Sequence, residues 1–205
     1  DEFKINSDVQ HYGAKRVEIK EDIYVYQYDG IKSYSDFGMK DQYQNEEELT
    51  FMVWINPNKF QSSPIIDNYS LLLWIGEPRK QVRFEYQYGE FDNNNKKIKK
   101  NFLVDSKTQY ELDKWLHITA VYKRGAYLKI YLNGKLDTQI DNIKNEYGDN
   151  WLFSDFFVGK SKQANGKRFF SGMIDVEKIG IYNKEISQDD IKSYYNSTKK
   201  RYSAK

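Results

Sequence analysis

The sequence of 205 residues contains no cysteine, which excludes disulfides, thiolate metal ligands and cysteine nucleophiles. It has only three prolines and scattered glycines, and no stretch of it has the composition of a linker between domains. No apolar run approaches the roughly 18 residues that a membrane-spanning helix needs. The net charge is only +2, so the charge balance indicates neither a nucleic acid nor a membrane surface as the partner.

Signals for common catalytic chemistry are also missing. His11 and His117 are the only histidines, and the sequence has no H-E-x-x-H motif, phosphate-binding glycine loop or zinc-ligand spacing. The first ten residues, DEFKINSDVQ, lack the character of a signal peptide, as expected of a mature protein or an excised domain.

Aromatic residues, in contrast, are abundant. They make up 17% of the chain, and 18 of them are tyrosines. Tyrosine and tryptophan suit pleated sheets, and they also suit surfaces that stack on sugars or proteins.

Alternation of side chains predicts an all-β fold. Predicted strands cover residues 16–19, 22–28, 49–57, 63–68, 69–76, 81–91, 115–123, the run YLKIYLNG from residue 127, 155–160 and 173–183. Asn133-Gly134 predicts a type I′ hairpin turn after one of these runs, because both central positions of that turn need a positive φ. About a dozen short strands joined by turns indicate one β sandwich that comprises residues 1–205.

Two further segments have distinct signals. Ser187 followed by Asp190 resembles a capping box and predicts a short helix over residues 188–196. The stretch FDNNNKKIKKN at residues 91–101 carries four lysines and predicts an extended, solvated hairpin loop, with a nucleic-acid patch as the alternative.

Four motifs occur in an order that is typical of a known family. They are FMVWINP at residue 51, WLHITAVY at residue 115, LKIYLNGKL at residue 128, and FVG at residue 157 followed by FSGMIDVEKIGIYNKEISQDDI. Together they resemble the laminin G-like, concanavalin A-like jelly-roll domains over roughly residues 20–196. The lectin-like part of the clostridial neurotoxin binding region is similar as well.

The resemblance implies two antiparallel sheets packed face to face, one of them concave. It also implies architectural roles for the last motif: Gly172 allows a tight turn, Asn183 caps the turn before the helix, and three isoleucines face the core. These are Ile174, Ile179 and Ile181.

Some members of this family are glucanases, which carry E-x-D-x-x-E along one strand so that two carboxylates share a face. The nearest approach is MIDVEK, where Asp175 and Glu177 are two residues apart but Met173 holds the leading acid position. A glycoside hydrolase is therefore the weaker hypothesis.

Many relatives hold a calcium ion with carboxylates from loops. Asp29, in YDG, and Asp175, in MID, are the expected ligands, because calcium prefers hard oxygen donors. The alternative is that Asp29 caps a turn and Asp175 bonds to loop backbone.

Binding is the expected activity, since a pyranose ring offers an apolar face and a rim of hydroxyls. In QVRFEYQYG, Arg83, Glu85 and Gln87 share a polar face that is opposite a core face. The candidate aromatic contacts are Trp54, Trp74, Trp151 and Tyr26. Trp54 and Trp74 suit core packing or a ligand platform. Trp151 lies in a loop. Tyr26 belongs to a stripe with Tyr24 and Tyr28, which forms a solvent-exposed aromatic face or packs on a neighbouring domain.

The sequence thus predicts a non-catalytic carbohydrate-binding or adhesion module within a larger secreted or cell-surface protein. Its expected partner is a glycan, with calcium as a possible cofactor. A structural protein–protein interaction domain is the alternative.

Overall fold

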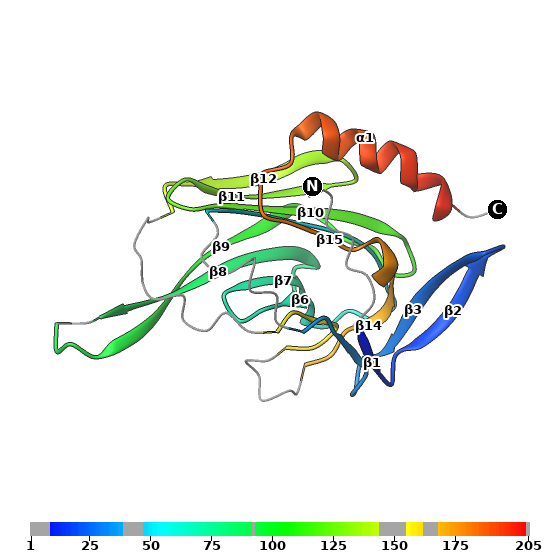
Figure 1. Cartoon of the computed structure of the whole chain (residues 1–205), viewed down its shortest axis with the longest axis horizontal. Helices are drawn as coiled ribbons and strands as arrows, with labels where there is room; N and C mark the ends of the chain where they lie inside the picture. Colours follow the sequence, from blue (N-terminus) through cyan, green and yellow to red (C-terminus); the bar gives the residue numbers. More distant parts are fainter. Residues whose placement is uncertain (1–8, 39–46, 92, 144–154, 162–167, 204–205) are drawn as a thin grey trace.

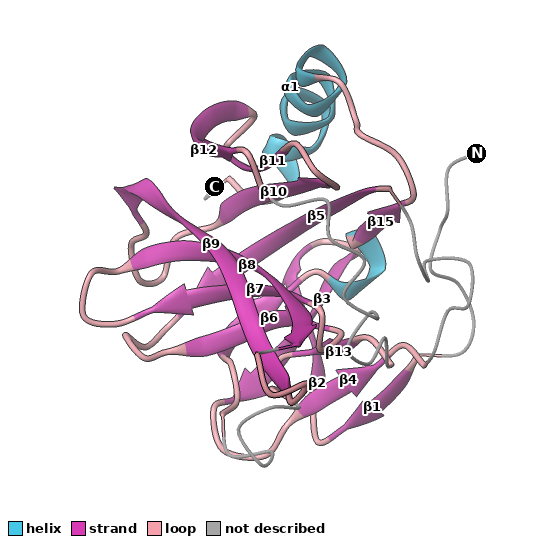
Figure 2. Ribbon diagram, turned by 90° about the vertical axis from the view of Figure 1, so that its left-hand side faces the viewer, coloured by secondary structure: helices cyan, strands magenta, loops and turns pink. Residues whose placement is uncertain are grey.

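The fold is a sandwich of two antiparallel sheets, and α-helix occurs in the described residues only near the C-terminal end (Figure 1, Figure 2). This computed structural model describes residues 9–38, 47–91, 93–143, 155–161 and 168–203. It confirms the predicted all-β class, the two-sheet jelly roll and the short C-terminal helix.

One sheet has seven strands, in the order β1-β4-β13-β6-β7-β8-β9. Its strands are β1 (Gln10–Tyr12), β4 (Tyr34–Asp36), β6 (Ser63–Asp67), β7 (Leu71–Gly76), β8 (Gln81–Phe91), β9 (Lys97–Gln109) and β13 (Phe157–Val158). The hairpin of β8 and β9 projects beyond the body of the sandwich (Figure 1).

Strand β9 corrects one sequence-based expectation. The lysine-rich stretch 91–101 was predicted to be a loop, but β9 begins at Lys97 and pairs with β8 along its length. A ladder between neighbouring strands uses backbone groups, so exposed lysine side chains do not prevent it.

The other sheet has eight strands, with β12-β11-β10-β5-β14-β3-β2 in one path and β15 paired with β5. Its strands are β2 (Lys15–Lys20), β3 (Ile23–Asp29), β5 (Glu48–Pro57), β10 (Leu116–Lys123), β11 (Tyr127–Leu132), β12 (Lys135–Asp141), β14 (Ser171–Ile174) and β15 (Gly180–Tyr182).

Alternate apolar residues of both sheets fill the space between them. Phe51, Val53 and Ile55 of β5 are completely buried in this core, as the sequence predicts. The three isoleucines of the last motif are also buried there. Gly172 has φ +136°, and a Cβ atom on it would lie 2.2 Å from the carbonyl oxygen of Asn56, so larger residues are excluded. The tight turn expected there is wrong, because Gly172 lies within β14 and is paired with Tyr28 and Pro57.

The outer face of the eight-stranded sheet is covered by α1 (Gln188–Thr198) (Figure 1). Ile191 of the helix is fully buried against Met52, Val121 and Tyr131. The helix begins as predicted, because Ser187 Oγ accepts a hydrogen bond from the backbone N–H of Asp190 at 3.1 Å. Asn183 lies four residues before this cap, in the bend after β15, and its expected role in that turn stays a prediction.

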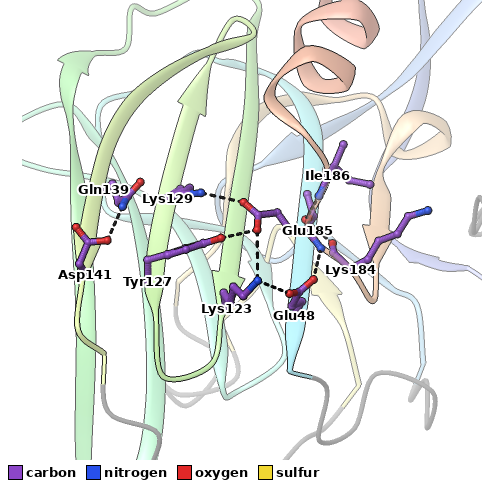
Figure 3. A network of polar contacts seen from close by, with 10 residues as sticks. Glu48, Lys123, Tyr127, Lys129, Gln139, Asp141, Lys184, Glu185 and Ile186 are labelled. Atoms are coloured by element: carbon purple, nitrogen blue, oxygen red, sulfur yellow. Dashed lines mark hydrogen bonds and ion pairs between the residues drawn. The ribbon is translucent and has the colours of Figure 1, made fainter.

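A polar network holds the segment between β15 and α1 against the sheet (Figure 3). Glu185 accepts hydrogen bonds from the Tyr127 hydroxyl and, at 2.8 Å, from Lys129 Nζ. Its backbone N–H donates to Glu48 at 2.9 Å, and Lys123 Nζ bridges Glu48 at 2.7 Å and Glu185 at 3.8 Å. Partial burial would raise the pKa of Glu185, but these donors hold it below its ordinary value.

Replacing Glu185 with glutamine is expected to lower the free energy of unfolding by about 1 kcal/mol, because the amide keeps the shape but loses the charge-assisted bonds. The melting temperature should fall by about 2–4 °C. Thermal unfolding at low and high salt measures this, and the loss should shrink at high salt. Glu177→Gln is the matched control, because its ion pair with Arg16 is exposed and 3.6 Å long. Equal effects of the two substitutions would contradict the assignment.

Candidate glycan-binding face

The outer face of the seven-stranded sheet brings four of the predicted site residues together. In β7, Leu73 and Ile75 point into the core, so Trp74 between them faces outward. In β8, the core residues Val82, Phe84 and Tyr86 leave Arg83, Glu85 and Gln87 on the outer face. Trp74 is paired directly with Arg83, which places the ring beside the polar row.

Strand β9 adds polar side chains that sequence reasoning missed. Asp105 is paired with Arg83, and Asn101 with Gln87. The alternation of Lys99, Asn101, Leu103 and Asp105 is a signal that could have found them, but its first two residues belong to the stretch 91–101 for which the sequence predicts a loop.

Two shallow depressions flank Trp74. One, of about 190 Å³, extends over Arg83 and Asp105 toward Glu77 and Arg79. The other, of about 480 Å³, extends over Gln87 and Asn101 toward Lys99 and Ser161. Trp74, Glu85 and Arg168 line both, so these three residues form the centre of the face.

Hydrogen bonds hold the polar groups of this face in place. Arg83 and Asp105 form a two-pronged pair, with N–O distances of 2.7 and 2.9 Å. This bonding to Asp105 raises the pKa of Arg83. The amides of Gln87 and Asn101 donate to Glu85 Oε1 at 2.7 and 2.9 Å. Oε2 of Glu85 accepts no hydrogen bond from the part of the chain that the structure describes.

Two cations lie on this face, Arg168 at its centre and Lys99 in the larger depression. The Arg168 guanidinium carbon lies 5.5 Å from the centre of the Trp74 ring. Arg168 forms no ion pair within the described ranges. Burial lowers the pKa of Lys99, and the nearby charge of Glu85 opposes that shift.

The other predicted aromatic residues lie elsewhere or outside the described residues. Trp54 is 2% exposed and lies beneath the C-terminal helix, so it is a packing residue of the opposite sheet. Tyr26 packs on the core and stacks on His11, with ring centres 3.9 Å apart. Tyr28, two residues further on, is 1% exposed, so Tyr26 and Tyr28 of the expected solvent-exposed stripe are turned toward the core. Trp151 lies outside the described residues.

A profile of the concanavalin A-like lectin/glucanases superfamily matches residues 29–192. The chain belongs to this superfamily. Such a match over most of the chain agrees with the motifs and with the observed sandwich.

Solved structures of toxin binding domains share the fold of this lectin/glucanase-superfamily chain. The binding domain of Paraclostridial Mosquitocidal Protein 1 has a TM-score of 0.65 at 14% identity, with 94% of this chain and 48% of that chain covered. The receptor-binding domain of the botulinum neurotoxin C/D mosaic serotype has a TM-score of 0.64 at 18% identity, with 94% of this chain and 47% of that chain covered. A structure of botulinum neurotoxin type C has a TM-score of 0.64 at 17% identity, with 94% of this chain and 47% of that chain covered. Cell entry of that toxin depends on interaction with two ganglioside molecules.

The superfamily chain spans about half the length of those toxin chains. No curated protein matches its sequence. None of the helices within the described ranges is long and apolar enough to cross a membrane.

The superfamily includes glucanases, so the positions of the acids matter. Asp175 is completely buried, and its Oδ2 accepts a hydrogen bond from the Tyr202 hydroxyl at 2.6 Å. Glu177 is exposed on the short 3₁₀ turn Val176–Lys178. The acid pair that the sequence singles out thus lies on the eight-stranded sheet, away from the depressions around Trp74.

The two expected calcium ligands do not form a joint site. Asp29 pairs with Ser171 at the start of β14, whereas Asp175 follows Ile174 at its end. Asp29 Oδ1 accepts four hydrogen bonds, from the backbone N–H groups of residues 31–33 and from Ser33 Oγ. Its slight burial would raise the pKa of Asp29, but these donors hold it well below the ordinary value, as in a turn cap.

Within the described ranges, no three histidine, aspartate or glutamate side chains gather as a metal site would require. Calcium binding at Asp29 or Asp175 remains a prediction.

Proposed function

We propose that the outer face of the seven-stranded sheet binds a glycan, and that the chain is a non-catalytic recognition module of a larger secreted or cell-surface protein. The observation that carries the proposal is the Trp74 ring, which stands at the centre of two depressions whose other lining residues are mostly polar. Such a ring packs on the apolar face of a sugar, while fixed polar groups bond to its hydroxyls.

The hydrogen-bond pattern supports specific roles for the central groups. Glu85 is held by two amides through Oε1, which leaves Oε2 to accept a hydrogen bond from a sugar hydroxyl. The guanidinium of Arg168, next to the Trp74 ring, would donate hydrogen bonds to hydroxyls of the same sugar. Because Arg83 and Asp105 already bind each other, they act as a rigid wall rather than as mobile charges.

The polar lining favours a sugar over the alternative of a protein-docking domain. The centre of a protein interface is depleted in charged residues, whereas the centre of this face holds Glu85, Arg168 and Arg83 around one ring. The ganglioside dependence of botulinum neurotoxin type C adds support from a protein with the same fold.

Alanine in place of Trp74 is expected to weaken glycan binding about tenfold or more, since removing the ring removes its stacking contact and the area it buries. The wild type is first screened on a glycan array. Affinity gel electrophoresis with laminarin, xylan, pectin and chondroitin sulfate then compares the two proteins.

Leu136→Ala is the matched control, because Leu136 is 44% exposed on the opposite sheet. Repeating the gels with EDTA tests the calcium prediction. Wild-type binding that Trp74→Ala leaves unchanged would contradict this site, and release of reducing ends from a bound polysaccharide would contradict the non-catalytic role.

A further inference from the structure

A second group of aromatic rings lies at the β1 edge of the same sheet. Tyr12 of β1 and Tyr34 of β4 are direct cross-strand partners, and their rings stack with centres 4.6 Å apart and planes 12° apart. Tyr34 also meets Phe157 of β13 edge to face at 5.9 Å. Tyr12 is 42% exposed, so this stack ends in a ring that solvent reaches.

These rings face outward, on the side of the sheet that carries Trp74. Between Tyr34 and Asp36, Ser35 is completely buried, and its Oγ bonds to the Tyr28 hydroxyl of the other sheet at 2.7 Å. His11, next to Tyr12, bonds to the same Ser35 at 2.8 Å. Since neighbouring residues of a strand point to opposite faces, Tyr12 and Tyr34 point away from the core.

A lysine lies over these rings, just as Arg168 lies over the ring of Trp74. Lys160 Nζ lies 4.1 Å from the Tyr34 ring centre and 5.0 Å from that of Phe157. Lys160 makes no ion pair with another described residue. Lys160 and Arg168 belong to the two arms of one segment, in which the N–H of Ser161 donates to the carbonyl of Arg168 at 3.0 Å.

We propose that Tyr12, Tyr34 and Lys160 form a second glycan platform, so that one polysaccharide chain is held at two points of the same sheet face. This rests on the proposed function of Trp74. Strands β13 and β6 separate β4 from β7, so at the usual strand spacing the strand of Tyr34 is about 14 Å from that of Trp74, and β1, which carries Tyr12, is about 19 Å away. A single sugar cannot contact both, whereas a polysaccharide chain can.

The test compares a polymer with its own disaccharide. The probes are whichever of laminarin, xylan, pectin and chondroitin sulfate binds the wild type best, and the disaccharide prepared from it. Calorimetry on the full chain is expected to show that Tyr12→Ala weakens polymer binding about tenfold, because the second contact and its effective concentration are lost. Binding of the disaccharide, which occupies the Trp74 site, should be unchanged. Tyr12→Phe keeps the ring and should bind as the wild type does.

The outcomes separate the two proposals. One outcome is that Trp74→Ala binds neither the polymer nor the disaccharide, while Tyr12→Ala binds the polymer as tightly as the wild type does. This outcome overturns the second platform and supports the proposed function. Equal weakening of both probes by Tyr12→Ala also overturns it, because it indicates a general structural effect. Failure of the wild type to bind any of the four polysaccharides overturns both proposals.

Discussion

Trp54→Ala is expected to lower the free energy of unfolding by about 3–5 kcal/mol, the cost typical of removing a large buried aromatic side chain. For a domain of this size the melting temperature should fall by about 6–20 °C. Thermal and denaturant unfolding of the variant and the wild type measure the change.

The contacts of Trp54 explain so large an effect. Its ring stacks on Tyr202 and Tyr195, with centres 4.2 and 5.7 Å away, and its Nε1 donates to Thr198 Oγ1 at 3.2 Å. These three partners all come from the last helix and the turn after it. Removing the ring therefore leaves a cavity and also weakens the attachment of the C-terminal segment, which Ile191 still anchors to the sheet.

Trp74→Ala is the matched comparison, since it removes the same side chain from the outer face of the other sheet. Because Trp74 is only partly exposed, its loss should cost about 1–3 kcal/mol, less than the loss of Trp54, while its effect on glycan binding is large. The pair of variants thus separates packing from recognition. A Trp54 variant that is as stable as the wild type would show that the C-terminal segment does not depend on this ring.

Local alternation was sufficient to predict part of the face. In β8 the strict alternation of apolar and polar residues placed Arg83, Glu85 and Gln87 on one side, and the structure confirms it. The alternation reports only which residues share a face. It does not report that Asp105 and Asn101 complete that face, because this depends on the pairing of β8 with β9.

Contacts between segments distant in sequence explain what could not be predicted. Leu72 and Trp74 share the outer face of β7, yet Leu72 is only 1% exposed, because the segment that carries Ser161 and Arg168 lies beside it. This coverage removes the alternation from LLLWIG, so the orientation of Trp74 stayed open. Arg168 itself reaches the site from nearly a hundred residues away, and local sequence contains no signal for that approach.

The last motif shows a similar limit. Residues 173–183 were predicted as one strand, but the structure divides them into β14, a 3₁₀ turn at Val176–Lys178 and β15. Both strands pair with β5, so Ile174, Ile179 and Ile181 are all buried although the strand is interrupted. Hydrophobic pattern alone therefore identified the core residues correctly and the element bounds incorrectly.

Acid is expected to destabilise the fold through His117, which is completely buried between Trp54 and Tyr194 with ring centres 5.0 and 5.4 Å away. Neither ring nitrogen has a hydrogen-bond partner among the residues that the structure describes. Burial lowers the pKa of His117 to about 3.

In the unfolded chain the His117 pKa is about 6.5, so between these values the unfolded state binds a proton that the folded state does not. Stability is therefore fully present above about pH 6.5 and falls on acidification by about 1.4 kcal/mol per pH unit. The total loss from this one group approaches about 5 kcal/mol near pH 3.

His117→Leu is expected to remove this slope, because leucine fills a similar volume and does not titrate. At neutral pH it should cost little, since it also removes the two unpaired ring nitrogens. Denaturant unfolding of both proteins at pH values from 4 to 8 measures the difference. Asp175, whose pKa burial raises, gives a slope of opposite sign, but it is present in both proteins and cancels in the comparison. If the stability curves of the wild type and His117→Leu stay parallel below pH 6, the prediction is wrong. His117 would then be protonated in the folded state, and the aromatic rings around it would tolerate its charge.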